Sequence, residues 1–275
     1  MFDPKLNNKY PYPEDTSGHY LEVNLDRGIV FDKNYPYIDY SKSFAFKRFW
    51  VRLLLRLIVF PLAKFRFGLR IYGKDNLKKY KDVLSKGAIT VSNHVHMWDY
   101  IFNMKALHKI KWSYVLVWDK NVNGESGPLV RLVGGIPIPV NDQEATIAFN
   151  KEVKKMLDDD NILQIYSEGS MWEYYAPIRP FKNGAACLAI KNNKPILPLA
   201  YSYRKAGWLR QKLFKQTALF NLNIGEPIFA NPDLDKSSQV DDLTTKVHQS
   251  VCYLAGFEGN NIYKPLYNYS KRIDY

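Results

Sequence analysis

The sequence has 275 residues and 46% hydrophobic content, enough to bury a sizeable core in one large domain or two small ones. Its only cysteines, Cys187 and Cys252, stand among apolar neighbours, which argues against a disulfide framework. The N-terminus lacks the basic and apolar regions of a signal peptide, so we expect a cytosolic location.

The net charge of +12 is concentrated in two stretches of the chain. Residues 42–82 hold twelve Lys or Arg against two Asp, and residues 201–225 hold five basic residues and no acidic one. Clustered basic charge attracts nucleic acid, anionic lipid headgroups or phosphorylated substrates. The residues next to the basic clusters are needed to decide which of these partners is meant.

Residues 1–43 are rich in Tyr, Pro, Asn and Asp without a sustained period, and we interpret them as an irregular arm. Residues 44–72 have a different composition, in which large apolar residues are mixed with Lys and Arg. Their longest uncharged run, 57–63, is far shorter than the roughly 20 apolar residues of a bilayer span.

Three arginines in that segment, Arg48, Arg52 and Arg56, recur every four residues and would share one face of a helix. Trp50 and many Phe, Leu and Val residues fill the remainder. This pattern favours an amphipathic helix that binds membrane lipids at the cytoplasmic face through these four residues, rather than nucleic acid. An ordinary helix packed on the core, with its arginines in solvent, is the alternative.

From residue 73 to 275, short apolar strands alternate with amphipathic helices. Asn141 and Glu144 resemble a capping box that opens a helix to Leu157. The alternation predicts an α/β fold with a mixed, largely parallel sheet covered by helices. Strands are predicted at 88–92, 112–118, 136–140, 162–166, 196–201 and 219–224, and helices at 99–107, 128–133, 141–157, 184–192 and 240–254.

The sharpest chemical signal is Ser-Asn-His-Val-His-Met-Trp-Asp at 92–99, where a strand ends and a helix begins. Asp99 can fold back across this turn to accept a hydrogen bond from His94. Such a pair fixes the imidazole tautomer and raises the basicity of the other ring nitrogen, as a general base requires. His96 is a weaker alternative base, and Asn93 would orient the turn or donate to a reacting carbonyl.

The Asn-His-x-x-x-x-Asp spacing resembles the first motif of the glycerolipid acyltransferases, the 1-acylglycerol-3-phosphate acyltransferase (PlsC-like) family. Four further blocks follow in that family's order within residues 87–200: Gly-Gly-Ile-Pro-Ile-Pro-Val (134–140), Tyr-Ser-Glu-Gly-Ser (166–170), Phe-Lys-Asn-Gly-Ala-Ala (181–186) and Lys-Pro-Ile-Leu-Pro (194–198).

The resemblance implies direct transfer of a fatty-acyl group from acyl-CoA or acyl carrier protein to the hydroxyl of a lysophospholipid, most simply 1-acylglycerol-3-phosphate. It implies His94 as base, Asp99 as its orienting partner, Gly135 as a supporting residue and no cofactor or metal. The resemblance assigns acceptor binding to the block Glu168-Gly169-Ser170.

This sequence departs from the family at Val140 and Met171, where arginines usually hold the acceptor phosphate. Arg179 and Lys182 are the best replacements, and Arg131 and the basic residues of 204–215 are further candidates. The other interpretation is a lysolipid acceptor without a phosphate.

Two other classes remain to be tested. The pair His94-x-His96 superficially resembles the zinc motif of metallo-β-lactamases, although its Asp falls one residue late and Tyr100 replaces the final His. A non-enzymatic basic module for membranes would explain the charge, but it would not need the ordered motifs.

Overall fold

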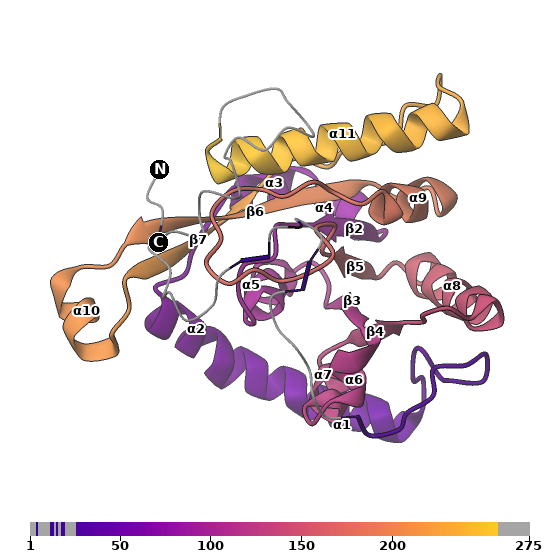
Figure 1. The fold of residues 1–275 in the computed structure, drawn as a ribbon, viewed down its shortest axis with the longest axis horizontal. Coiled ribbons are helices and arrows are strands. Elements are labelled where there is room, and N and C mark those ends of the chain that lie inside the picture. Colours follow the sequence, from indigo (N-terminus) through magenta and orange to yellow (C-terminus); the bar gives the residue numbers. More distant parts are fainter. Residues whose placement is uncertain (1–3, 5–11, 14, 16–17, 20–25, 258–275) are drawn as a thin grey trace.

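The computed structural model describes residues 4, 12–13, 15, 18–19 and 26–257, and within them a seven-stranded sheet has the order β1-β7-β6-β2-β5-β3-β4 (Figure 1). Neighbouring strands of this described sheet are parallel except β6 and β7. The predicted α/β class with a mixed, largely parallel sheet is confirmed. The strands are β1 (Arg70–Tyr72), β2 (Ala88–Val91), β3 (Ser113–Trp118), β4 (Gly135–Ile138), β5 (Ile162–Ile165), β6 (Ile196–Lys205) and β7 (Ala218–Ile224).

Helices cover both faces of the sheet, and the connections decide which face each one takes. The crossover from β2 through α5 (Asp99–Leu107) to β3 runs one way along the sheet, whereas β5 through α9 (Gly184–Lys191) to β6 runs the other way. Because such crossovers are right-handed, α5 and α9 lie on opposite faces. Helix α2 (Phe60–Phe67) packs beside α5, and the long α11 (Lys236–Ala255) packs on α9 and β6.

The reversal of direction between β2 and β5 creates a topological switch point. Open α/β sheets bind ligands outside the carboxyl ends of the strands at such a point. The motif at 92–99 follows β2, and the motif at 166–170 follows β5, so the fold brings both to this place.

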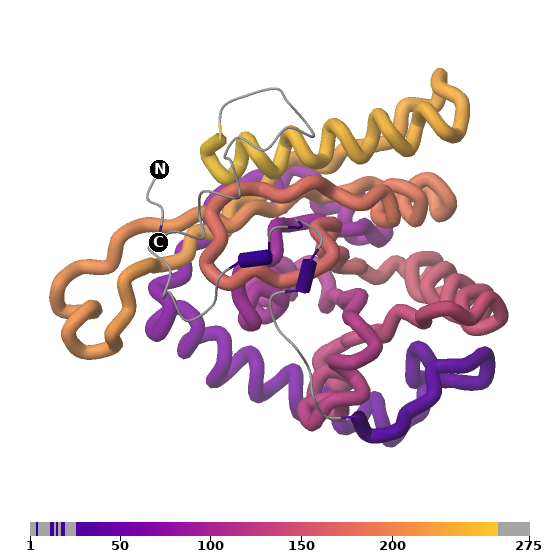
Figure 2. The backbone as a smooth tube through the Cα atoms, in the orientation of Figure 1, coloured from indigo at the N-terminus to yellow at the C-terminus, as the bar shows by residue number. Residues whose placement is uncertain are grey.

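The predicted amphipathic helix forms a nearly continuous rod, which Figure 2 shows along the lower side of the molecule. It comprises α1 (Lys42–Leu54), a π-helical turn (Leu55–Val59) and α2 (Phe60–Phe67). Pro61 lacks an N–H and would clash with a carbonyl four residues earlier in a regular helix. The wider π turn immediately before it accommodates the proline without breaking the rod.

Several boundaries differ from the predictions. Asp142, not Asn141, caps α8 (Gln143–Asp158) by accepting a hydrogen bond from the Ala145 N–H, so the predicted capping box is wrong. Asn141 instead has a positive φ of 56° in the preceding turn. The last helix begins four residues earlier than predicted, because Asp235 caps it.

Short elements were not predicted because they carry too few periodic residues to give a signal. These are the strand β1 and the helices α3 (Lys74–Lys79), α4 (Lys81–Leu84), α6 (Asp119–Asn123) and α10 (Trp208–Phe214). Helix α7 (Gly127–Leu132) corresponds to the helix expected at 128–133. Much of the arm at 1–43 lies outside the described residues.

Candidate active site

His94 and Asp99 come together at the carboxyl end of β2. Nδ1 of His94 lies 3.1 Å from Oδ2 of Asp99, and the same oxygen accepts the backbone N–H groups of Val95 and His96 at 2.6 and 2.9 Å. The His94 side chain is 23% exposed, whereas that of Asp99 is fully buried. With the Asp99 carboxylate as acceptor, Nδ1 carries the proton and Nε2 keeps a free lone pair.

Opposing effects act on the Asp99 carboxyl group. Burial is the largest effect, so the pKa of Asp99 is raised above its ordinary value, while the hydrogen bonds from His94 and the two backbone amides act in the other direction and favour the ionised form. Asp99 is also the first residue of α5, where the helix dipole favours negative charge. The turn therefore holds a carboxylate against one edge of the imidazole ring, and this contact orients the ring.

Asn93 positions the turn instead of facing a substrate. Its Oδ1 accepts the Tyr201 N–H at 2.7 Å and its Nδ2 donates to the Tyr201 carbonyl at 3.2 Å, both in the interior. The Tyr201 hydroxyl in turn donates to the carbonyl of Asp99 at 2.7 Å. Of the two roles expected for Asn93, the structure supports orientation of the turn.

Tyr166 was not predicted as a site residue. It follows β5, and its ring stacks on the His94 imidazole with centroids 3.8 Å apart and planes 13° from parallel. The signal available in the sequence was an aromatic residue directly after the strand that neighbours β2. Tyr166 thus covers one side of the candidate base.

Glu168 was expected to bind the acceptor, but its carboxylate is 2% exposed and fully engaged within the protein. Oε2 accepts the His94 backbone N–H and a guanidinium N–H of Arg179, both at 3.0 Å. Oε1 accepts the Arg179 backbone N–H at 2.9 Å. In this structure Glu168 ties the loop after β5 to the turn that carries the base.

Arg179 was expected to bind a phosphate, and the structure corrects this prediction. Its side chain is 0% exposed, pairs with Glu168, donates to the Ser170 hydroxyl at 2.8 Å and lies over the Trp172 ring. A guanidinium in these contacts would have to abandon Glu168 to reach a ligand. Ser170 likewise faces inward, since its hydroxyl donates to the carbonyl of Gly18.

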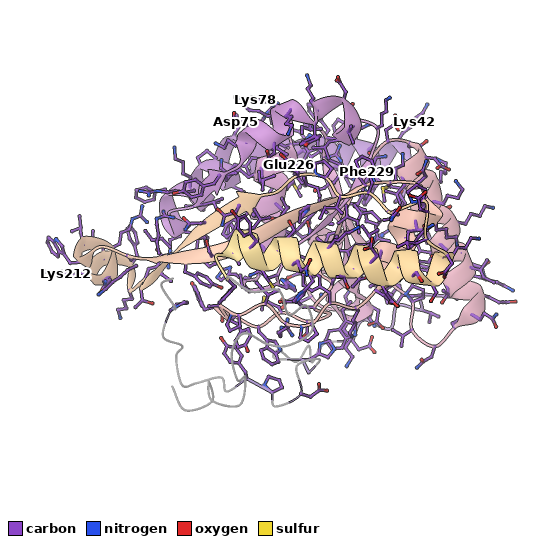
Figure 3. All side chains as sticks on the ribbon, turned by 90° about the horizontal axis from the view of Figure 1, so that it is seen from above. Lys42, Asp75, Lys78, Lys212, Glu226 and Phe229 are labelled. Carbon is purple, nitrogen blue, oxygen red and sulfur yellow. The ribbon has the colours of Figure 1, made fainter. Side chains whose placement is uncertain are left out.

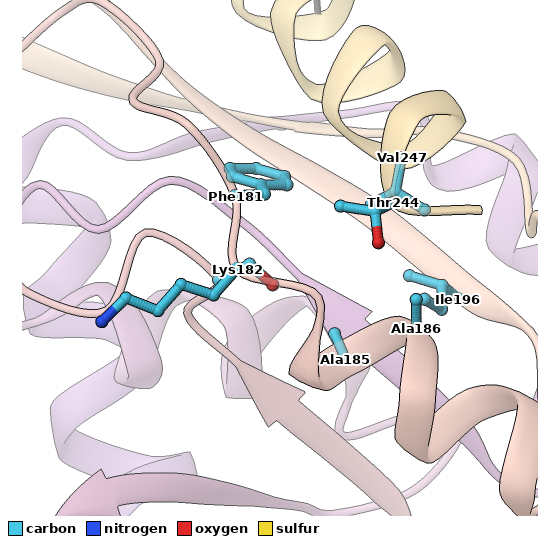
Figure 4. A pocket seen from close by; sticks show the side chains of 8 residues that line it. Phe181, Lys182, Ala185, Ala186, Ile196, Thr244 and Val247 are labelled. Atoms are coloured by element: carbon cyan, nitrogen blue, oxygen red, sulfur yellow. The ribbon is translucent and has the colours of Figure 1, made fainter. Parts of the chain in front are cut away.

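Lys182, by contrast, remains exposed and makes no ion pair in the described part of the chain. Its backbone N–H donates to Ser167, and its side chain crosses Gly169, where a Cβ atom would meet Nζ at 2.8 Å. Gly169 has a φ of 82°, so both its backbone and this close approach favour glycine. Figure 4 shows the Lys182 side chain extending away from the small cavity between Phe181 and Thr244.

The described residues of the arm lie against this loop. The carbonyl of Gly18 accepts hydrogen bonds from Ser170 and from Trp172 Nε1, and Tyr12 stacks on Trp172. His19 stacks on Trp118 at the carboxyl end of β3, with centroids 4.4 Å apart. The arm therefore contributes side chains near the edge of the sheet where the site lies.

Lys120 completes a cluster of two lysines and one histidine that the motifs did not reveal. Its Nζ lies 4.7 Å from the centroid of the same Trp118 ring on which His19 stacks. His19 and Lys120 thus meet on the same Trp118 ring. Partial burial and then the charges of Lys182, Lys120 and Arg179 lower the pKa of His19. We call His19, Lys120 and Lys182 the cationic cluster.

His96 does not share the surroundings of His94. Its ring is buried among Phe67, Phe102 and Phe220, and its Nδ1 accepts the Trp98 N–H at 3.1 Å. Burial lowers its pKa to about 4. Within the described residues, no three His, Cys, Asp or Glu side chains form a group that could hold a metal ion.

Gly135 and Arg131 serve the packing of β4. A Cβ at Gly135 would lie 2.5 Å from the Val130 side chain, so glycine allows the preceding helix to approach the strand. Arg131 donates to the carbonyls of Pro36, Tyr37 and Gly135 and is not a free phosphate ligand. Gly135 starts β4, at the end of the strand away from the site.

Arg48, Arg52 and Arg56 of the rod do not form an outward basic stripe, contrary to prediction. Arg48 donates to the Tyr114 hydroxyl at 2.7 Å, and Arg52 lies over the Trp112 ring. Arg56 is exposed. A large apolar surface is exposed along the rod instead, together with Lys42, Lys47, Arg56 and Lys64. The exposed apolar residues are Phe46, Phe49, Trp50, Leu54, Leu57, Ile58, Leu62 and Phe65.

No helix in the described ranges is both long enough and apolar enough to cross a bilayer.

Residues 68–202 match the family model described as acyltransferase. The chain therefore carries a domain of the acyltransferase family, and the resemblance inferred from the motifs is confirmed.

Among solved structures, the chain is similar to the 1-acyl-sn-glycerophosphate (LPA) acyltransferase PlsC from Thermotoga maritima. The two share 14% sequence identity with a TM-score of 0.48, over 80% of this chain and 91% of that one. No curated protein matches the chain at a significant level.

Proposed function

We propose that this acyltransferase moves a fatty-acyl group from a thioester to the hydroxyl of a lysophospholipid, with His94 as the general base. The observation that carries the proposal is the 3.1 Å contact between His94 Nδ1 and Asp99 at the switch point of the sheet. It leaves Nε2 without a hydrogen bond in the described residues, on a side chain that solvent reaches. A positioned base of this kind contributes about 10²–10⁴-fold.

In the proposed reaction, Nε2 of His94 takes the proton of the acceptor hydroxyl as its oxygen attacks the thioester carbonyl carbon. The tetrahedral intermediate then collapses, the carbon–sulfur bond breaks, and the imidazolium returns the proton to the departing thiolate. Asp99 stabilises the transient imidazolium. No acyl-enzyme intermediate, metal or organic cofactor is required.

We propose a phosphorylated acceptor, 1-acylglycerol-3-phosphate or a close relative, because of the cationic cluster. His19, Lys120 and Lys182 come from three segments and have no carboxylate partner among the described residues. A phosphate dianion would supply the missing negative charge and would favour protonation of His19. In this proposal Lys182 binds the acceptor phosphate, as expected from the sequence. Lys120 and His19 take the phosphate-binding role that was expected of Arg179.

We also propose that the apolar outer face of α1 and α2 rests on the cytoplasmic face of a membrane, where the acceptor resides. Eight large apolar side chains are exposed along it, including Trp50 at 53% and Phe65 at 61%. Exposed apolar stripes of this extent mark interaction surfaces, and Trp and Phe favour the lipid interface. The donor is acyl-CoA or acyl carrier protein, both of which are anionic partners for a basic surface.

The decisive experiment is an acceptor panel with purified protein and labelled acyl donors. It should compare lysophosphatidate, other lysophospholipids, monoacylglycerol and lysoglycolipids, with acyl-CoA and acyl carrier protein in parallel. We expect transfer to lysophosphatidate that survives chelators. Turnover of uncharged acceptors alone would overturn the phosphate assignment, and loss on chelation restored by zinc would overturn the metal-free mechanism.

A further inference from the structure

Helix α10 occupies the connection between β6 and β7 and projects beyond the rest of the sheet (Figure 1). Figure 3 places Lys212 of this helix at the far end of the molecule. Its outward residues are large and apolar: Trp208 is 74% exposed, Leu209 53% and Leu213 64%. A short helix gains nothing within the monomer by leaving these side chains in water.

The charge around α10 is uniformly positive. Residues 203–225 contain no Asp or Glu, and Lys205, Lys212 and Lys215 are exposed. The two arginines of this stretch have structural tasks, since Arg204 and Arg210 donate to backbone carbonyls of neighbouring segments. The three lysines therefore surround the apolar residues without partners that neutralise them in the described residues.

The surface of α10 continues that of α2. Arg210 donates to the Phe65 carbonyl at 2.7 Å, and the Phe214 and Phe65 rings meet edge to face with centroids 5.7 Å apart. Phe65 also belongs to the exposed apolar face of the rod. The two helices, which are far apart in sequence, therefore present adjoining apolar surfaces.

We propose that α10 is a second membrane contact, in which Trp208, Leu209 and Leu213 enter the interface of an anionic bilayer while the lysines face its headgroups. Lysines alone would suit any acidic partner, but exposed Trp and Leu between them favour a lipid surface. The inference rests on the membrane association proposed above. It adds an element outside the N-terminal rod and fixes the molecule on the bilayer at two points.

The test attaches an environment-sensitive fluorophore to the thiol of a Leu213→Cys variant. The background carries Cys187→Ser, because Cys187 is exposed whereas Cys252 is buried. Vesicles of phosphatidylcholine with phosphatidylglycerol should shift the emission to the blue, and phosphatidylcholine alone should do so weakly. The matched control is Tyr253→Cys on α11, which is 77% exposed and lies on the opposite face of the sheet from α2. The label on this control should not respond.

A second measurement compares vesicle binding of Trp208→Ser/Leu213→Ser with the parent protein. We expect the dissociation constant to rise at least about tenfold, because two large side chains no longer leave water. Melting temperature and transfer between detergent-dispersed substrates should be unchanged. An unresponsive label at position 213 on protein that still sediments with vesicles would overturn the inference while leaving α1–α2 association and the acyltransferase proposal standing. A response to acidic carrier protein but not to vesicles would also overturn it.

Discussion

The guanidinium of Arg179 lies 3.0 Å from the carboxylate of Glu168 in a place that solvent does not reach. The same carboxylate accepts the backbone N–H of His94. The pair therefore joins the loop after β5 to the turn that carries the candidate base. A buried charge that loses its partner is costly, so this pair makes the geometry of the site depend on Arg179.

Replacing Arg179 by Ala should lower the free energy of unfolding by about 3–5 kcal/mol, because the Glu168 charge would remain buried alone. Transfer to phosphorylated and uncharged acceptors should fall by similar factors. Chemical denaturation and the acceptor panel measure the two effects. A stable variant with a loss confined to lysophosphatidate would instead make Arg179 a phosphate ligand.

Substitutions in the cationic cluster should have the opposite effect from Arg179→Ala: they should spare stability and impair transfer to phosphorylated acceptors selectively. Lys182→Ala and Lys120→Ala should leave stability unchanged and reduce transfer to lysophosphatidate by about tenfold or more, because charge-assisted contacts with the phosphate are lost. The reduction should diminish in high salt. Transfer to monoacylglycerol is the internal control, and an equal loss with both acceptors would contradict the assignment. Lys191→Ala is a matched lysine variant at the distant end of α9.

His94→Ala should reduce acyl transfer by at least about 10²-fold while folding and vesicle binding persist, because a general base is removed. Asp99→Asn should also be severely impaired, since an amide cannot stabilise the imidazolium as a carboxylate does. Steady-state transfer rates and circular dichroism check both. Retention of more than about a tenth of the activity in His94→Ala would be incompatible with this role.

The stacked ring of Tyr166 should act as a positioning residue for His94. Tyr166→Phe should retain nearly full activity, whereas Tyr166→Leu should lower kcat by about 2–10-fold, the range expected from loss of aromatic stacking. The loss should appear in kcat with little change in KM for either substrate. Equal behaviour of the Phe and Leu variants would show that stacking has no part in orienting the base.

The buried His96 predicts a dependence of stability on pH. Its pKa is about 4 in the folded protein against 6.5 for an unperturbed histidine, so the unfolded chain binds the extra proton first as pH falls. Stability should therefore decline from about pH 6.5 and level off below pH 4, by about 3 kcal/mol in total for this group. His96→Asn keeps an acceptor for the Trp98 N–H and removes the titration. Denaturation curves of this variant should show a shallower decline than the parent over the same range.

The sequence alone determined the fold class, the order of the main strands along the chain and the pairing of His94 with Asp99. These follow from local rules: buried parallel strands are continuous apolar runs, and five residues across a strand–helix turn bring two side chains together. The acyltransferase family was also recognisable, because five short motifs occur in the family's order within one chain. Such features depend on neighbours in sequence.

Only the tertiary structure decided what the charged residues do. Glu168 and Arg179 are eleven residues apart and turn toward each other inside the molecule, whereas His19, Lys120 and Lys182 gather from three segments. The helix period placed Arg48, Arg52 and Arg56 on one side but could not say that Arg48 and Arg52 would meet Tyr114 and Trp112. A periodic pattern defines a face of a helix, and only the packing of distant segments determines whether that face meets solvent, lipid or the core.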